Sequence, residues 1–251
     1  MFGWFVKGAA SRVKTTRYPA LAETARGTTP GRPIATALTT APIGLEVAAK
    51  CPTGAITASP LQATLDMSRC VHCLACARGE NRIAWAMDYR WATWAGDAAR
   101  RTRPPRAFQK SLHIRVVDTG SCDAVITEIK QLAKPYYNMH RLGFFITPTP
   151  RHADVLMVTG PVTSQMRLAL RKTYAAMPEP KWVIAVGNCA ITGCVFAPSF
   201  VASGSVAEVI PVDVQVPGCP PPPLAILHGL LLLTGRETEM PMTDQPGGAL
   251  P

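Results

Sequence analysis

A run of three cysteines spaced three residues apart constrains this chain more than any other feature. The run is Cys70-Val71-His72-Cys73-Leu74-Ala75-Cys76, and Cys51 stands upstream in a Cys-Pro pair. The chain shows no apolar leader of the secretory kind, so we expect it in the cytosol, where thiols stay reduced. The cysteines are therefore predicted to bind a metal centre rather than to form disulfides.

This pattern is one complete ligand set for a [4Fe–4S] cluster. In bacterial ferredoxins the cysteine of a Cys-Pro pair binds a different cluster from the triplet beside it. Here no triplet precedes Cys51, and the residues directly after Cys76 (Ala77-Arg78-Gly79-Glu80) contain no Cys-Pro pair. We predict one cluster held by Cys51, Cys70, Cys73 and Cys76, with His72 exposed or hydrogen-bonded rather than a ligand. Structural zinc is the rival, although zinc favours two separated Cys-x2-Cys knuckles.

A second group of four cysteines lies in the C-terminal half, each of them near a glycine. The group consists of Cys122, Cys189, Cys194 and Cys219. Glycine lets the backbone approach an inorganic core closely, and loop amides can then hydrogen-bond its sulfides. Spacing alone leaves two interpretations open, a second cluster and buried structural cysteines.

From residue 112 onward the hydrophobic pattern predicts alternating strands and helices. Strands are expected at 112–117, 143–147, 154–158, 182–186 and 209–214, and helices at 122–133, 163–176 and 224–234. Continuous apolar strands joined by helices indicate an α/β fold with a parallel sheet covered on both faces. Ligands of such sheets bind at the carboxyl ends of the strands, where the second group of cysteines falls.

Charge is distributed unevenly along the chain. Residues 1–110 carry sixteen Lys and Arg against six Asp and Glu, whereas residues 111–251 carry ten of each. The first part is expected to face an acidic protein or anionic lipid, and nucleic acid is disfavoured because aromatics are not interleaved with the arginines. Residues 1–14 predict a short amphipathic helix, at a membrane interface, in a partner groove or frayed against its own domain. No apolar run is long enough to cross a bilayer.

These features predict four parts. We expect a ferredoxin-like segment at 1–99, a basic linker at 100–110, an α/β domain at 111–236 and a tail at 237–251. Within the first part, residues 18–48 are rich in Thr, Ala, Pro and Gly and are expected to be extended, irregular chain.

Four segments of the C-terminal half carry a resemblance to a known family. They are RLGFF (141–145), PRHADVLMVTGPVT (150–163), MPEPKWVIAVGNCA (177–190) and VDVQVPGCPPPP (212–223). Residues 120–236 resemble the small subunit of group 4 membrane-bound [NiFe]-hydrogenases of the formate hydrogenlyase type. They are equally similar to the complex I subunit that bears the last iron–sulfur cluster. Residues 1–80 resemble the ferredoxin-type subunit of the same complexes, so the chain resembles a fusion of two adjacent subunits with a half-ferredoxin in front.

The resemblance implies a flavodoxin-like fold that carries a proximal [4Fe–4S] cluster facing a partner large subunit. By position, Cys122, Cys189 and Cys219 match three of the family's four ligands, while the place of the fourth is taken by Val125. Oxygen-tolerant hydrogenases resemble this chain in having a cysteine five residues after the loop ligand, which here is Cys194. We predict that Cys194 replaces the missing thiolate.

Glu128 matches a glutamate that the family places beside this cluster. It is predicted either to take up a proton when the cluster is reduced, since burial raises a carboxyl pKa, or to lie on the helix surface or in a partner salt bridge.

The sequence therefore predicts an electron-transfer subunit of an oxidoreductase that carries two [4Fe–4S] clusters. It would relay electrons between a ferredoxin-like donor and the NiFe or quinone site of a large subunit. Membrane-arm subunits are expected beside it, at the cytoplasmic face of the inner membrane. Two alternatives stay open, namely a hydrogenase-like complex without nickel and a non-redox protein with zinc or a scaffold role.

Overall fold

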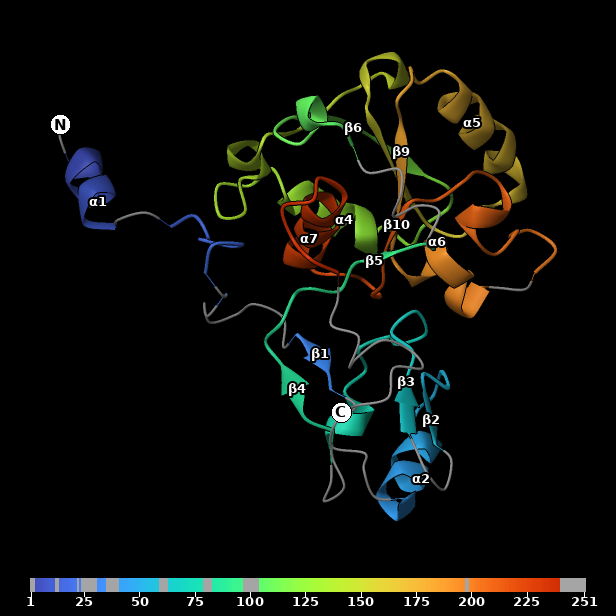
Figure 1. Ribbon diagram of the computed structural model, residues 1–251. Helices are drawn as coiled ribbons and strands as arrows, with labels where there is room; N and C mark the ends of the chain where they lie inside the picture. The colour runs from blue at the N-terminus through green and yellow to red at the C-terminus, as the bar shows by residue number, and fades with distance from the viewer. Residues whose placement is uncertain are drawn as a thin grey trace.

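The computed structural model of the chain describes residues 3–11, 14–21, 23, 31–34, 41–58, 63–78, 83–96, 104–196 and 199–239. Figure 1 shows a larger part built around one sheet, a smaller part made of short N-terminal elements below it, and helix α1 (Gly3–Ser11) standing apart from both. Among the described residues, no helix has both the length and the apolar character needed to span a membrane.

The large sheet has six strands in the order β5-β10-β9-β8-β6-β7. The strands are β5 (Thr93–Trp94), β6 (Leu112–Asp118), β7 (Phe144–Ile146), β8 (Val155–Thr159), β9 (Trp182–Val186) and β10 (Val214–Val216). All neighbours pair in parallel except β5, which pairs antiparallel with β10. In chain order the parallel strands run 2-1-3-4-5, which is the flavodoxin-like order. The predicted α/β fold with a parallel sheet is confirmed.

Helices cover both faces of this sheet. They are α4 (Ala124–Gln131) and α7 (Pro223–Leu233) on one face, and α5 (Ser164–Ala175) on the other. Side chains of a strand point alternately to the two faces. In β8, accordingly, Val155 and Met157 pack in the core under α4 and α7, whereas Leu156 and Val158 pack in the core under α5. Burial on both sides explains why the strands are continuously apolar.

Helix α7 is buried over its whole length, from Pro223 to Leu233. It packs against β10, and a Cβ added at Gly229 would lie 2.5 Å from Val216 Cγ2. Glycine is therefore required there by the close approach of the helix to the strand. The helix predicted at 224–234 is confirmed within one residue at each end.

One predicted strand is wrong in its position. The strand expected at 209–214 is found at 214–216 as β10. Residues Val206–Glu208 instead form a 3-10 turn that is closed by a capping box between Ser205 and Glu208. Pro211 follows this turn, and it has no N–H to give to a sheet. Apolar residues at 209 and 210 pack into the core from this turn rather than from a strand.

The expectation of irregular chain at 18–48 is wrong at its C-terminal end. Helix α2 occupies Ala41–Ala49, although residues 35–40 lie outside the described ones. Its residue Val47 is fully buried, and Glu46 pairs with Lys50 one turn later at 2.8 Å. The proline and glycine of this stretch disfavour a helix in the sequence pattern. The helix forms nevertheless, because burial against the rest of the protein and residues with good helix propensity stabilise it.

The smaller part contains two antiparallel pairs of short strands. They are β1 (Arg32–Pro33) with β4 (Trp85–Ala86), and β2 (Ile56–Ala58) with β3 (Ala63–Leu65). One continuous core connects this part to the large sheet, because Ile56 and Leu65 belong to the same buried cluster as the residues of α7. The four-part division of the chain stays a prediction, and residues 100–103 of the expected linker at 100–110 lie outside the described ones.

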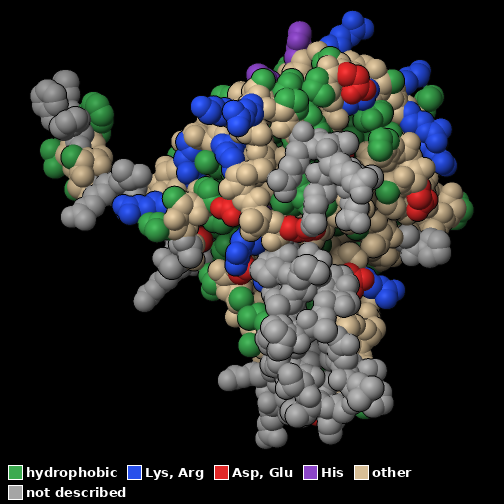
Figure 2. Space-filling model, viewed as in Figure 1, with side chains coloured by type: hydrophobic (Ala, Val, Ile, Leu, Met, Phe, Trp, Pro, Cys, Tyr) green, Lys and Arg blue, Asp and Glu red, His purple; other side chains and the backbone are tan. Residues whose placement is uncertain are grey.

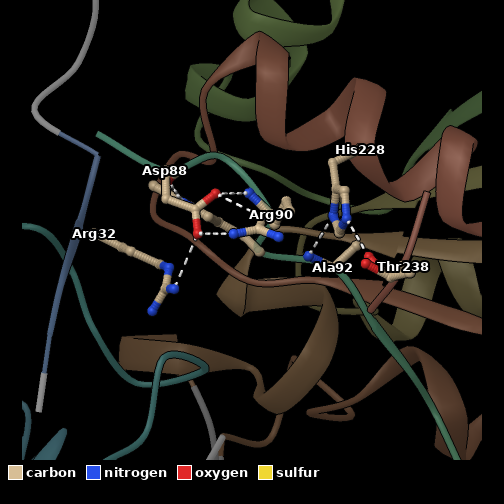
Figure 3. Close-up of polar contacts among 7 residues, drawn as sticks. Arg32, Asp88, Arg90, Ala92, His228 and Thr238 are labelled. Atoms are coloured by element: carbon tan, nitrogen blue, oxygen red, sulfur yellow. Dashed lines mark hydrogen bonds and ion pairs between the residues drawn. The ribbon is translucent and has the colours of Figure 1, made fainter. Parts of the chain in front are cut away.

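Figure 3 shows two groups of polar contacts, one that joins α7 to the chain before β5 and one within the smaller part. The Nδ1 atom of His228, on α7, accepts a hydrogen bond from the backbone N–H of Ala92 (3.1 Å), and its Nε2 bonds to the carbonyl of Thr238 (2.8 Å). Nearby, Asp88 pairs with Arg32 at 3.1 Å and with Arg90 at 3.2 Å.

Figure 2 shows one face of the molecule, on which Lys and Arg side chains lie in several separate groups. Many of them lie over the part built on the large sheet.

Candidate metal centres

The four cysteines of the first group line one cavity in the smaller part. This first quartet is Cys51, Cys70, Cys73 and Cys76. Cys51 lies just after α2, and the other three lie on the chain between β3 and β4. The backbone has positive φ at His72 (53°) and Leu74 (60°), which curls the triplet tightly. This curl lets three thiols so close in sequence share one cavity with a fourth from another segment.

The thiols of the first quartet differ in their electrostatic surroundings. Burial tends to raise the pKa of Cys51, but hydrogen bonds from the backbone at Ile56 and from Thr53 lower it overall. Burial raises the pKa of Cys70 to about 12. Burial and the charge of the neighbouring thiol of Cys73 both raise the pKa of Cys76. Such thiols lose their protons only when a positive centre compensates them. The amide donors around Cys51 are of the kind that tunes a metal-bound sulfur.

His72 forms part of an aromatic layer beside the first quartet. Its ring stacks on Trp91 with centroids 4.9 Å apart and meets Trp85 edge-on at 5.9 Å. Both ring nitrogens are buried and have no hydrogen-bond partner among the described residues, and burial lowers the pKa of His72 to about 4. The expectation that His72 is exposed or hydrogen-bonded is wrong, because the tryptophans enclose the ring.

The four cysteines of the second group meet at the carboxyl ends of the parallel strands. This second quartet is Cys122, Cys189, Cys194 and Cys219. Cys122 follows β6, Cys189 lies in the short helix α6 (Asn188–Thr192) directly after β9, and Cys219 follows β10. Cys194 begins the next 3-10 turn with a positive φ of 49°.

The thiols of the second quartet lie close enough to shift one another's pKa. The shifts couple Cys189, Cys194 and Cys219 to one another. The hydrogen bond to Cys219 and burial raise the pKa of Cys189, whereas the bonds that Cys219 accepts lower its pKa. Cys122 is close enough for its charge to raise the pKa of Cys189 further. Cys194 therefore lies among the three cysteines that the family resemblance picks out.

Val125, which stands where the family has its fourth cysteine, is buried in the core under α7. It lies against the loop of the second quartet, because a Cβ added at Gly187 would be 2.9 Å from Val125 Cγ2.

Backbone geometry shapes the loops of the second quartet. The Asp118 carboxylate accepts hydrogen bonds from the N–H groups of Gly120 (2.9 Å) and Ser121 (2.7 Å), which fixes the turn before Cys122. Gly218, before Cys219, has a φ of +136°, and an added Cβ would lie 2.6 Å from Pro221 Cα. Only glycine fits this approach without displacing the backbone.

Asn188 is a site residue to which sequence reasoning gave no role. Its side chain is buried and bonds to the carbonyl of Cys70 at 2.8 Å, from the first quartet. The only signal in the sequence is its place directly before Cys189, because the partner residue is 118 positions away.

Glu128 is half-buried on α4, and burial raises the pKa of its carboxyl group. Burial is the main reason why the pKa of the Tyr137 hydroxyl is raised, and the charge of Glu128 raises it further. The direction of the shift favours the protonated form of Glu128, whose role stays a prediction.

The donor chemistry of both quartets fits an iron–sulfur cluster. Each offers four thiols, and the first adds amide donors to sulfur. In the described part of the chain, no three His, Cys, Asp or Glu side chains form a set that could hold a metal ion. Ligands of a four-iron cluster bind four different irons and so need not converge on one point.

In a comparison with known protein families, residues 122–233 match the family described as NADH ubiquinone oxidoreductase, 20 Kd subunit. The probable membrane-bound hydrogenase subunit mbhJ of Pyrococcus furiosus is 43% identical over 130 residues, which cover 52% of this chain and 78% of that relative. Formate hydrogenlyase subunit 7 of Escherichia coli is 35% identical over 142 residues, covering 57% of this chain and 56% of the relative. A chain of the membrane-bound sulfane sulfur reductase, an archaeal respiratory membrane complex, is 31% identical with a TM-score of 0.45, covering 53% of this chain and 76% of that one.

Proposed function

Since this chain belongs to the family of the NADH ubiquinone oxidoreductase 20 Kd subunit, we propose that it is the electron-transfer subunit of a membrane-bound, hydrogenase-like complex. The observation that carries the proposal is the gathering of all eight cysteines into two quartets, one lining a single cavity and one at the carboxyl ends of parallel strands. Ligand sites of open α/β sheets lie at those strand ends.

Each quartet is proposed to hold one [4Fe–4S] cluster. Such a cluster, when bound, accepts and releases single electrons at a potential set by charge, hydrogen bonds and burial. The residues of this chain provide thiolates and fixed loops and break no covalent bond. The isolated chain is accordingly expected to have no hydrogenase activity.

Cys194 is proposed as the fourth ligand of the second quartet. Its support is that its thiol lies close enough to those of Cys189 and Cys219 for them to shift its pKa, while Val125 presents only an apolar side chain at the position where the family has cysteine. Glu128 is proposed to take up a proton when the second quartet's centre gains negative charge, because burial already raises its pKa.

The partners proposed for the chain follow from its relatives. A large subunit with a NiFe centre or a quinone pocket would face the second quartet, and a ferredoxin-like donor would deliver electrons to the first. We propose that residues 1–80 correspond to a separate ferredoxin-type subunit in related complexes. Helix α1 exposes Trp4 and Val6, which supports docking against membrane-arm subunits or lipid at the cytoplasmic face.

The test is an iron count with EPR on the full chain, purified anaerobically. About eight irons per chain and two reducible centres are expected, as two four-iron clusters require. Cys76→Ser should lower the signal of one centre and Cys194→Ser that of the other. A colourless protein without a reducible signal contradicts the proposal and favours the zinc or scaffold alternative.

A further test separates two versions of the complex. Paired Cys-x2-Cys motifs in the partner large subunit would indicate nickel ligands, and their absence would indicate a hydrogenase-like complex without nickel. In both versions the electron-transfer role of this chain is the same.

A further inference from the structure

One buried side chain joins the two quartets. Asn188 is 1% exposed, and its Nδ2 donates to the carbonyl oxygen of Cys70 (2.8 Å). Its Oδ1 accepts from the backbone N–H of Gly218 (2.6 Å), and its own N–H donates to the Gly218 carbonyl (3.0 Å). Asn188 is bonded directly to Cys189, and Gly218 directly to Cys219. The amide therefore connects one ligand residue of the first quartet with two of the second.

The chemistry of this position selects a carboxamide. The side chain must donate at one atom and accept at another in the same plane, and Asn does both. An aspartate would set a second oxygen against the Cys70 carbonyl, and leucine would leave a buried acceptor and a buried donor without partners. The protein thus keeps a polar group in its interior at the point where the quartets approach.

Near Asn188, the two parts of the protein are joined by a contact of Thr192 and are otherwise separated by a hollow. Thr192, on the same short helix, donates to the carbonyls of Ser68 (3.4 Å) and Asn188 (3.2 Å). Beside these bonds a hollow of about 320 Å³ lies between the two parts, lined by Pro52, Thr53, Arg69, Thr192, Cys194 and Val195. Next to this hollow, Asn188 supplies a short and fully buried connection.

We propose that Asn188 is a positioning residue that fixes the distance between the two quartets and forms a direct hydrogen-bonded link between them, an inference that rests on the proposed function. In the step that it serves, one electron leaves the centre of the first quartet, which is oxidised, and enters the centre of the second, which is reduced. The reductant is a low-potential one-electron donor of the ferredoxin class. No bond to Asn188 forms or breaks.

The experiment compares Asn188→Leu and Asn188→Asp with the wild-type chain, all purified anaerobically. Iron content, the magnetic splitting between the two reduced centres and the rate of electron transfer between them are measured by chemical assay and by rapid-freeze EPR. We expect the splitting and the rate to fall in both variants. Loss of iron from the second quartet alone also supports positioning, because the loop of Gly218 is then released.

Arg141→Gln is the matched control. Arg141 Nη2 donates to the carbonyl of Tyr18 and so also links the N-terminal and C-terminal halves, but it touches no cysteine. This control should keep the wild-type splitting and rate. The inference is overturned if the Asn188 variants keep full iron, splitting and rate, or if Arg141→Gln lowers the splitting and rate equally. A wild-type chain without two reducible centres refutes the proposed function instead.

Discussion

The imidazole of His228 and the backbone N–H of Ala92 form a hydrogen bond of 3.1 Å across 136 residues of sequence. The N–H of Ala92 can only donate, so Nδ1 accepts and the proton of the neutral ring is on Nε2, which donates to the carbonyl of Thr238 at 2.8 Å. One buried ring thereby joins helix α7 to the chain that leads into β5 and to residues near the C-terminus.

This geometry predicts that the chain loses stability in mild acid. Burial lowers the pKa of His228 from 6.5 to about 4, so between these values the unfolded chain binds a proton that the native chain does not. The free energy of unfolding should fall as the pH drops through this window, by roughly 3 kcal/mol in total. Urea unfolding at a series of pH values measures it. In His228→Leu this part of the pH dependence should vanish, and an unchanged slope contradicts the assignment.

Asp88 is predicted to be essential for the stability of the smaller part. Its carboxylate pairs at 3.1 Å with Arg32, whose side chain is only 3% exposed. Asp88→Asn removes the negative charge beside a buried cation and should cost about 3–5 kcal/mol of unfolding free energy. Arg90→Gln removes the exposed partner of the same carboxylate and should cost under about 1 kcal/mol. Equal costs in the two variants would show that burial of Arg32 does not matter.

Gly218→Ala is expected to disturb the second quartet. A methyl group there would meet Pro221 Cα at 2.6 Å, in a loop that ends at Cys219. Gly235→Ala is the control, because Gly235 also has a positive φ (+72°) but lies in open space. In the control, the free energy of unfolding should fall only by the cost of placing a side chain in the left-handed region, about 1–2 kcal/mol. Thermal unfolding should show a larger loss of stability for Gly218→Ala, and this variant should also bind less iron. A loss of stability no larger than in the control would contradict the steric argument.

Val125→Cys is predicted to rescue Cys194→Ser. The Val125 side chain lies against Gly187, two residues before Cys189, so a thiol at this position is beside the second quartet. The single variant Cys194→Ser should lose iron from one centre, and the double variant should regain it. Iron content and EPR of the reduced chains decide the outcome. Full iron in Cys194→Ser alone would remove Cys194 from the ligand set.

Most of the α/β part follows from local pattern. Strands such as Trp182–Val186 are continuously apolar because both faces of the sheet are covered, and this makes them easy to recognise. The strand at 214–216 was displaced from its prediction because apolar residues 209 and 210 reach the core from a capped turn. Burial can be inferred from composition there, but backbone conformation cannot.

Long-range contacts set the limit of sequence reasoning at the site. The sequence groups the cysteines by motif, but nothing in it pairs Asn188 with Cys70 or places His72 against Trp91. Those contacts depend on how two separately patterned parts dock. Helix α2 was missed for a related reason, since the burial of Val47 is decided by a neighbour that lies elsewhere in the chain.

Strand β5 has a consequence for anyone who expresses the C-terminal half by itself. It pairs antiparallel with β10 and closes that margin of the sheet, yet it belongs to the N-terminal half. A fragment starting at residue 111 would bare the outer amides and carbonyls of β10, along with apolar surface of α7 under Ala92. An exposed strand edge of this kind tends to pair with strands of other chains. The fragment should therefore self-associate in the test tube unless residues 83–96 are supplied in trans.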